Sequence, residues 1–318
     1  MSTLITGGAG FIGSTLAETL LKKGQEVIVI DNFDDYYDIK LKRQNVVNNL
    51  NNPHYKLYEG SICDEKILDS IFSNNNVENV VHLAACAGVR NSFVTPAKYV
   101  KTNVEGTVNL LEKMKDYNIK KIIFTSSSSV YGNCNAEKFR EDMYNLSPIS
   151  PYAVTKLAGE QIIYAYSNTY DINAVCLRLF TVYGPRQRPD LAIRKFSQLI
   201  QKNEPIPVYG NGTTVRDYTY ISDVINGICA SIDYDKTPYE IINIAGGNPI
   251  TLNKMIETLE KIIGKKAITQ YLPLQKGDVY KTSANILKAK ELLGYCPQVS
   301  FEQGVKNYIQ WQKVTFNN

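Results

Sequence analysis

Histidine is scarce in this chain of 318 residues, which contains only His54 and His82. The six cysteines, at positions 63, 86, 134, 176, 229 and 296, form no CxxC pair and no cluster with histidine. This pattern excludes the usual zinc motifs and a disulfide framework, so we predict reduced thiols and no metal. His82 lies at the end of a predicted strand, where packing or bracing of a loop is a more common role than proton transfer.

Long apolar runs and long runs of basic residues are also missing. No stretch of 18 apolar residues occurs, which argues against a membrane-spanning helix and a membrane partner. The chain begins with a predicted strand and a glycine-rich loop, so we expect no signal peptide and a cytoplasmic protein. The net charge is +4, but lysine and arginine never form a run of five. We therefore predict no nucleic-acid partner, and the charge suits a small anionic ligand.

Short apolar runs alternate with amphipathic segments through the first two-thirds of the chain. Such alternation is typical of βαβ units around a parallel sheet. The expected fold class is α/β, a Rossmann-like doubly wound parallel sheet with a smaller α/β substrate-binding lobe. Strands are predicted at residues 3–6, 26–31, 80–84, 121–126 and 173–180, and helices at 12–22 and 99–115.

The sequence changes in character after Phe180, where prolines and glycines indicate loops and short strands. We predict a dinucleotide-binding Rossmann domain at residues 1–180, joined again by about 217–262. Residues 181–216 and 263–318 are predicted to form the substrate-binding lobe.

A glycine-rich segment, TGGAGFIG at residues 6–13, lies between the first strand and the first helix. Gly7, Gly10 and Gly13 fit one dinucleotide-binding spacing, and Gly8 with the last two fits GxGxxG. Glycines here allow a tight turn and close approach of a pyrophosphate to the helix N-terminus. Asp31 ends the second strand, where a carboxylate accepts hydrogen bonds from ribose hydroxyls and repels a 2′-phosphate. We therefore predict NAD as the cofactor.

Tyr152 and Lys156 are four residues apart at the start of a helix that Pro151 begins. This spacing places both side chains on one helix face. We expect the lysine ammonium to lower the pKa of the tyrosine toward the range of a useful acid/base group. The strand at 121–126 ends in a cluster of hydroxyls at 125–129, and open α/β sheets place ligands at such strand ends.

Several motifs in the same order resemble the extended short-chain dehydrogenase/reductase family, specifically its nucleotide-sugar 4-epimerases. They are TGGAGFIG at 6–13, HLAA at 82–85, SSSSVYG at 126–132, SPYAVTK at 150–156, TVYGPRQRPD at 181–190 and RDYTYISD at 216–223. The resemblance covers essentially the whole chain. It implies an isomerase that inverts the 4-hydroxyl of a UDP-sugar through a transient 4-keto sugar, with tightly bound NAD.

The resemblance also implies roles for individual residues. Ser127, Tyr152 and Lys156 would be the catalytic hydroxyl, the acid/base group and its helper. Ser61 stands where relatives commonly carry an aspartate that contacts adenine. The implied NAD site consists of Gly7, Gly10, Phe11, Ile12, Gly13, Asp31, Asn32, Ser61, Ile62, Leu83, Ala84, Asn103, Tyr152 and Lys156.

In the smaller lobe, Arg216 resembles the family's arginine for the UDP phosphates. Asp278 resembles the partner of the uridine ribose, and Tyr209 resembles the aromatic residue near uracil. The family's dehydratases carry an Asp-Glu pair after the catalytic hydroxyl, whereas this chain has Ser128-Ser129. Dehydration is therefore disfavoured.

The sugar is suggested by Thr181, because relatives acting on UDP-glucose or UDP-N-acetylglucosamine usually carry asparagine there. Together with RPD at 188–190 and AGVR at 87–90, it looks most like UDP-glucuronate 4-epimerases. The hydroxyls of Ser127, Ser128, Ser129 and Thr181 would then hydrogen-bond the carboxylate. Arg186 or Arg188 would supply positive charge if their loop folds inward.

Other sugars and functions stay open. Thr282 aligns with a position whose bulk limits the C2 substituent, and threonine leaves room for an N-acetyl group. UDP-N-acetylglucosamine or UDP-glucose is therefore the alternative substrate. The RPD motif argues only partly against a decarboxylase that forms UDP-xylose. A non-catalytic NAD-binding sensor on the same fold is a remote alternative.

The resemblance further implies a homodimer that pairs the helix after HLAA with the YxxxK helix. The residues expected to supply its apolar surface are Leu110, Leu111, Met114, Leu157, Ile162 and Tyr164.

Overall fold

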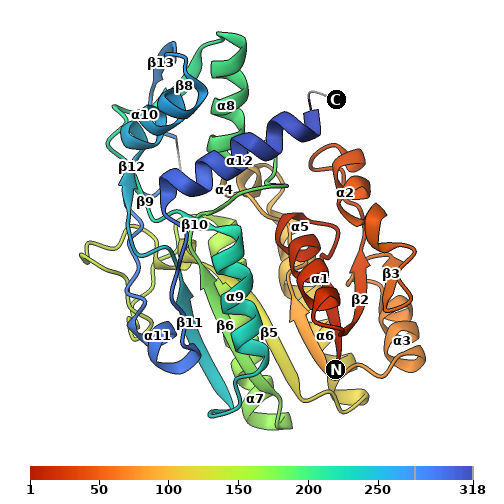
Figure 1. Cartoon of the computed structure of the whole chain (residues 1–318). Helices are drawn as coiled ribbons and strands as arrows, with labels where there is room; N and C mark the ends of the chain where they lie inside the picture. Colours follow the sequence, from red (N-terminus) through yellow and green to blue (C-terminus); the bar gives the residue numbers. More distant parts are fainter. Residues whose placement is uncertain (276, 317–318) are drawn as a thin grey trace.

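The computed structural model describes residues 1–275 and 277–316, and within them seven parallel strands form one sheet (Figure 1). Their order is β11-β6-β5-β4-β1-β2-β3. The chain runs outward from β1 in one direction and then in the other, which is the order of a doubly wound sheet. The predicted fold class is therefore confirmed. The strands are β1 (Ser2–Thr6), β2 (Glu26–Asp31), β3 (Tyr55–Glu59), β4 (Asn79–His82), β5 (Lys121–Ser127), β6 (Asn173–Leu179) and β11 (Tyr239–Ile244).

Both faces of the sheet are covered by helices, which explains why its strands are continuous apolar runs. Neighbouring residues such as Leu4 and Ile5 are both fully buried, but they belong to different core clusters on opposite faces. On one face lie α1 (Phe11–Lys22) and α9 (Ile221–Ile232), and on the other α3 (Glu65–Asn74), α6 (Gly106–Asp116) and α7 (Pro151–Tyr170).

Two elements differ from the sequence-based predictions. Strand β3 was not predicted, because it lies at the edge of the sheet and only Tyr55 among its residues is buried. The helix predicted at 99–115 is divided into α5 (Pro96–Val100), a π-helical segment at Lys101–Glu105 and α6. Asn103 lies inside this π-helical segment, and its side chain bonds the Cys86 backbone. Irregularities of this kind are frequent at functional sites.

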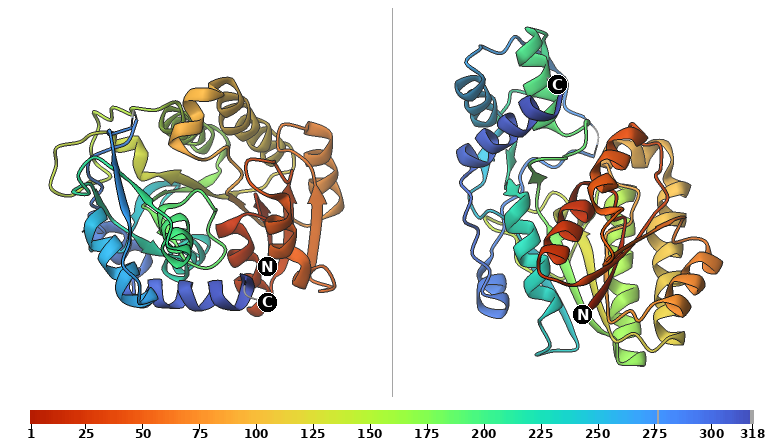
Figure 2. Two further views of the ribbon diagram at one scale, coloured as in Figure 1. Left: turned by 90° about the horizontal axis from the view of Figure 1, so that it is seen from above. Right: turned by 45° about the vertical axis from the view of Figure 1, so that its right-hand side comes forward.

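A second group of elements lies beyond one end of the sheet (Figures 1 and 2). Its helix α10 packs against α8 and α12, and β8 pairs in parallel with β13. The bounds are α8 (Ala192–Lys202), β8 (Ile206–Tyr209), α10 (Leu252–Ile263), β13 (Thr269–Leu272) and α12 (Phe301–Phe316). Short strand pairs join this group to the sheet: β7 (Val182–Tyr183) with β10 (Thr219–Tyr220), and β9 (Val215–Arg216) with β12 (Ile250–Thr251).

The remaining helices are short. They are α2 (Ile39–Val46), α4 (Val89–Val94), α11 (Leu287–Leu293) and the 3-10 turns Val47–Asn49 and Ser128–Tyr131. Within the described residues, no helix is long and apolar enough to cross a membrane. All six cysteines are free thiols.

Candidate functional site

A cavity of about 770 Å³ lies at the carboxyl ends of the central strands, where open α/β sheets bind their ligands. Residues that follow β1, β2, β4 and β5 form one part of its wall, and residues of the second group of elements form the other. Among the residues that line it are Gly7, Gly10, Phe11, Ile12, Gly13, Asp31, Asn32, Ser61, Ile62, Leu83, Ala84, Ser127, Ser128, Tyr152, Lys156, Thr181, Tyr209, Arg216, Asp278 and Thr282.

The glycine-rich loop at one end of the cavity tolerates no side chain at its key positions. Gly7 has φ +71°, and a Cβ there would lie 2.8 Å from the Ala84 nitrogen. A Cβ on Gly13 would collide with the Gly7 carbonyl oxygen. Helix α1 begins directly after the loop, so its unpaired N–H groups are available to a phosphate. This close backbone cradle fits the pyrophosphate of a dinucleotide.

Asp31 is buried at the end of β2 and is held by two backbone groups. Its Oδ2 accepts a hydrogen bond from Ala9 N (3.0 Å) and its Oδ1 accepts one from Phe33 N (2.8 Å). Burial raises the pKa of Asp31, and these hydrogen bonds oppose that rise. Each oxygen retains a lone pair for a ribose hydroxyl. The local chemistry therefore fits NAD.

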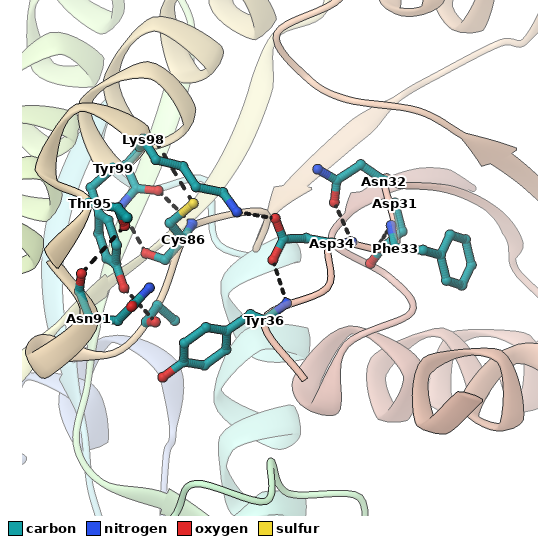
Figure 3. A network of polar contacts seen from close by, with 12 residues as sticks. Asp31, Asn32, Phe33, Asp34, Tyr36, Cys86, Asn91, Thr95, Lys98 and Tyr99 are labelled. Carbon is teal, nitrogen blue, oxygen red and sulfur yellow. Dashed lines mark hydrogen bonds and ion pairs between the residues drawn. The ribbon is translucent and has the colours of Figure 1, made fainter. Parts of the chain in front are cut away.

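An ion pair connects the loop after β2 with α5 at the edge of the cavity (Figure 3). Asp34 lies 2.6 Å from Lys98 Nζ and also accepts a hydrogen bond from Tyr36 N (2.9 Å). Burial alone would raise the pKa of Asp34, but the bond from Lys98 holds it below its usual range. The Tyr36 hydroxyl donates to Asp190 (3.3 Å), so the loop after β2 also contacts the loop after β7.

Asn103 is not among the residues that line the cavity, and its expected contact with NAD stays a prediction. Its side chain is buried and bonds the backbone N and O of Cys86 (2.7 and 3.0 Å) and the Thr155 hydroxyl (3.0 Å). It braces the cavity wall from behind. Ser61 does line the cavity, but its hydroxyl accepts a hydrogen bond from Cys63 N (3.1 Å) within a local turn.

His82 is buried and hydrogen-bonded at both ring nitrogens, to Thr6 Oγ1 (2.7 Å) and Thr107 Oγ1 (3.0 Å). Burial lowers the pKa of His82 to about 3, so the ring is neutral. These contacts support bracing of the strand ends rather than proton transfer.

Tyr152 and Lys156 both reach the cavity from the first turns of α7. The Ser150 hydroxyl caps this helix by accepting from Ala153 N (3.2 Å). Lys156 Nζ donates to Thr125 O (2.8 Å) and lies 4.8 Å from the centre of the Phe124 ring. Burial lowers the pKa of Lys156 to about 8.

The expected direction of the Tyr152 pKa is wrong in this structure. Burial raises the pKa of Tyr152, and the Ser127 hydroxyl and the Arg188 charge only oppose that rise. The Lys156 ammonium is bonded to a strand carbonyl instead. The spacing in the sequence predicts that Tyr152 and Lys156 share a helix face, but it does not predict the bond of Lys156 to the Thr125 carbonyl. Ser127 Oγ accepts from Ser129 Oγ (2.8 Å) and lies at the end of β5.

The sequence leaves open whether Arg186 or Arg188 supplies positive charge to the cavity, and the structure separates the two. Arg186 does not line the cavity and pairs with Glu18 on α1. Arg188 lines the cavity and is held by Asp190 through two hydrogen bonds (both 2.9 Å). Burial works against the Arg188 charge, but the Asp190 carboxylate keeps its pKa above the ordinary value.

At the other end of the cavity, Arg90 joins two residues predicted for uridine. Its guanidinium lies 3.0 Å from Asp278 Oδ2 and 4.7 Å from the centre of the Tyr209 ring. Sequence analysis placed Arg90 only in the AGVR motif and gave it no role. Its signal was position, because the loop after a central strand commonly reaches a ligand.

Three further predicted residues in this region make hydrogen bonds with the backbone. Arg216 donates to Val215 O (2.9 Å), and burial lowers its pKa while Asp278 opposes that change. The Thr282 hydroxyl is buried and accepts from Asp217 N (3.2 Å). Thr181 lies just beyond β6, and its carbonyl accepts from Thr219 N (2.9 Å).

Known proteins resemble this chain over nearly its full length. A family model described as GDP-mannose 4,6 dehydratase matches residues 4–308. The chain therefore belongs to that family, within the extended short-chain dehydrogenases/reductases that modify nucleotide sugars. A UDP-glucuronate 4-epimerase of Thermodesulfobacterium geofontis is 44% identical over 311 residues, which cover 98% of this chain and 95% of the relative. UDP-glucuronate 4-epimerase 1 of Arabidopsis thaliana is 38% identical and covers 98% of this chain and 76% of the relative.

Solved structures agree with this placement. A UDP-glucuronic acid 4-epimerase from Bacillus cereus, in complex with UDP-glucuronic acid and NAD, has a TM-score of 0.92 and 37% identity. The match covers 99% of this chain and 100% of that one. A UDP-glucose 4-epimerase from Thermotoga maritima with UDP-glucose has a TM-score of 0.91 and 36% identity, with 99% of both chains covered.

Proposed function

We propose that this chain inverts the 4-hydroxyl of UDP-glucuronate. The broader class is an NAD-dependent UDP-sugar 4-epimerase, and it rests on full-length relatives with that activity and on neighbours with bound NAD. The observation that carries the choice of sugar is Arg188, which lines the same cavity as Tyr152 and the hydroxyls of Ser128 and Thr181. A guanidinium with nearby hydroxyls suits a carboxylate.

In the proposed reaction, the Tyr152 phenolic oxygen takes the proton of the sugar 4-hydroxyl. It later returns a proton to the 4-oxygen, when C4 has the opposite configuration. The glycine-rich loop and Asp31 would hold NAD, which would supply a reversible hydride acceptor for C4, so that no net oxidation would occur. Ser127 would hydrogen-bond the sugar oxygen, and Lys156 would hold the nicotinamide ribose of NAD. The charge of Arg188, and not that of Lys156, opposes the rise of the Tyr152 pKa. Lys156 is buried, whereas Tyr152 and Ser127 are partly exposed on the cavity wall, where a sugar can reach them.

The dinucleotide and the UDP group would occupy opposite ends of the cavity. Gly7, Gly13 and Asp31 provide the backbone cradle and the ribose acceptor for NAD. Arg216 and Asp278 are proposed to hold the phosphates and ribose of UDP, and Tyr209 to pack near uracil. These proposals draw support from the shared cavity wall and from the family match.

UDP-N-acetylglucosamine remains the second candidate because Thr282 is small and lines the cavity. The two candidates differ in what they need from Thr181. A uronate carboxylate uses its hydroxyl as a donor, whereas a neutral sugar gains little from it.

The test is to incubate the purified protein with UDP-glucuronate, UDP-N-acetylglucosamine and UDP-glucose separately and follow C4 inversion by proton NMR. We expect the highest kcat/KM with UDP-glucuronate. Thr181→Val removes one hydrogen bond to a charged acceptor, about 1.5–3 kcal/mol, so kcat/KM for the uronate should fall about ten- to a hundredfold. Wild-type preference for UDP-N-acetylglucosamine by tenfold or more would contradict the proposal and favour the Thr282 argument.

We also propose a cytoplasmic homodimer, with a corrected surface. Leu110, Leu111 and Met114 were expected at the dimer contact, but they are fully buried against the chain's own sheet. Leu157 and Ile162 are partly buried against core clusters, whereas Tyr164 on α7 is 49% exposed, as a dimer contact requires. Val100 (53% exposed) and Val154 (51% exposed) are further exposed apolar residues, on α5 and α7. Helices α5 and α7, which carry them, contact one another.

A further inference from the structure

A fully buried ion pair lies behind the predicted catalytic residues. Glu160 on α7 is 0% exposed and Arg178 on β6 is 2% exposed. Arg178 Nε donates to Glu160 Oε1 (2.9 Å) and its terminal nitrogen donates to Oε2 (2.8 Å). Two parallel bonds of this kind fix both the distance and the orientation of the carboxylate.

The same carboxylate is connected to Lys156 by two routes. Glu160 follows Lys156 by four residues, so the two side chains share one face of α7. The Ser126 hydroxyl donates to Glu160 Oε1. The preceding residue of the strand, Thr125, offers the carbonyl to which Lys156 Nζ donates (2.8 Å). Helix spacing and two adjacent residues of β5 therefore link the carboxylate to the ammonium, without a direct ion pair between them among the described residues.

The other groups around Lys156 leave its charge poorly compensated. His82 at the end of β4 is neutral, and burial raises the pKa of the Cys86 and Cys176 thiols, so they carry no charge at neutral pH. Tyr152 lies one turn earlier on its own helix. Among the described groups that act on the ammonium, Glu160 supplies the carboxylate, and it counteracts the effect of burial.

We propose that Glu160, held by Arg178 and Ser126, is a positioning residue that keeps Lys156 charged and directed at the end of β5 for the epimerase reaction. The inference rests on the proposed function but assigns Glu160 no contact with substrate. A buried ion pair is a poor source of stability, because apolar residues of similar volume often stabilise a fold equally well. The position of Glu160, one helical turn from Lys156, is therefore better explained by the negative charge that Glu160 supplies.

Two substitutions separate charge from shape. Glu160→Gln keeps an oxygen for Ser126 but loses the charge, so the alkaline limb of kcat should move about one pH unit lower. Glu160→Asp keeps the charge but shortens the reach, so it should lower kcat while leaving the alkaline limb near its wild-type position. A merely structural role predicts the opposite: no shift of the limb in Glu160→Gln. As a control, Glu240→Gln removes a carboxylate of β11 that pairs with Lys288, and it should leave the profile unchanged.

A second readout needs no substrate. Protein labelled with ε-¹³C-lysine is titrated, and the Lys156 signal is assigned by its absence in Lys156→Met. We expect its midpoint to fall by about one unit in Glu160→Gln. If that variant fails to fold because Arg178 is left unpaired, Glu160→Gln/Arg178→Met removes both charges and should also lower the midpoint. An unchanged Lys156 midpoint would overturn the inference, whereas a wrong sugar in the proposed function would leave this titration unaffected.

Discussion

Tyr152 is a half-buried residue that lines the cavity, so its chemistry can be tested almost without change of shape. Tyr152→Phe removes the oxygen that takes and returns the proton. General acid–base groups contribute roughly 10²–10⁴-fold, and we expect turnover by C4-inversion assay to fall at least that much.

Retention of the fold and of NAD is part of the same expectation, since the ring stays in place beside Tyr99 (6.3 Å between centroids). Tyr144→Phe is the matched control, because Tyr144 is 91% exposed and lies outside the cavity. Wild-type turnover in Tyr152→Phe would refute the assigned role.

The residue scale also shows what the sequence alone could supply. Local spacing placed Tyr152 and Lys156 on one face of α7, and the structure confirms that both line the cavity. It did not supply the direction of the Tyr152 pKa, because burial raises this pKa and the opposing charge comes from Arg188, 36 positions along the chain. Glu160 was missed for the same reason. Its partner Arg178 lies on another element, although the repeated spacing of four was visible.

At the scale of elements, apolar runs located the central strands well because burial on both faces leaves a clear signal. The edge strand β3 lacked that signal. Periodicity did not predict the π-helical segment at Lys101–Glu105, in which Asn103 bonds the backbone of Cys86, 17 positions earlier in the chain. The assignment of chain segments to the two lobes stays a prediction.

The contact between α5 and the loop after β2 leads to a prediction about cofactor retention. The Asp34–Lys98 pair joins two segments of the cavity wall at the NAD end (Figure 3). Its side chains are 23% and 46% exposed, so the pair contributes at most about 1 kcal/mol. Lys98→Met should therefore speed NAD release about two- to fivefold, measured by dialysis and assay of the retained dinucleotide.

A matched control is available on the neighbouring helix. Lys113→Met breaks a comparable pair with Asp69 that lies away from the cavity, and it should leave NAD release unchanged. High salt should reduce the difference between Lys98→Met and wild type, because partly exposed charges are screened. Equal release rates at low salt would show that this pair does not retain NAD.

At the scale of the whole molecule, the two core clusters account for the apolar residues of the sheet but leave some on α5 and α7 exposed. A dimer through this surface would bury Val100 and Val154. Introducing a charge at the centre of an apolar contact without a partner costs several kcal/mol in a closed interface. Val154→Glu should therefore shift the protein from dimer to monomer at micromolar concentration, measured by light scattering.

The control must add the same charge to an equally exposed apolar residue elsewhere. Leu287 on α11 is 59% exposed, so Leu287→Glu should leave the dimer intact. Because α7 also carries Tyr152 and Lys156, a dimer contact on its outer side would connect the two active sites through paired helices. A monomeric wild type would rule out the dimer. A dimer that survives Val154→Glu would place the interface on another face of the molecule.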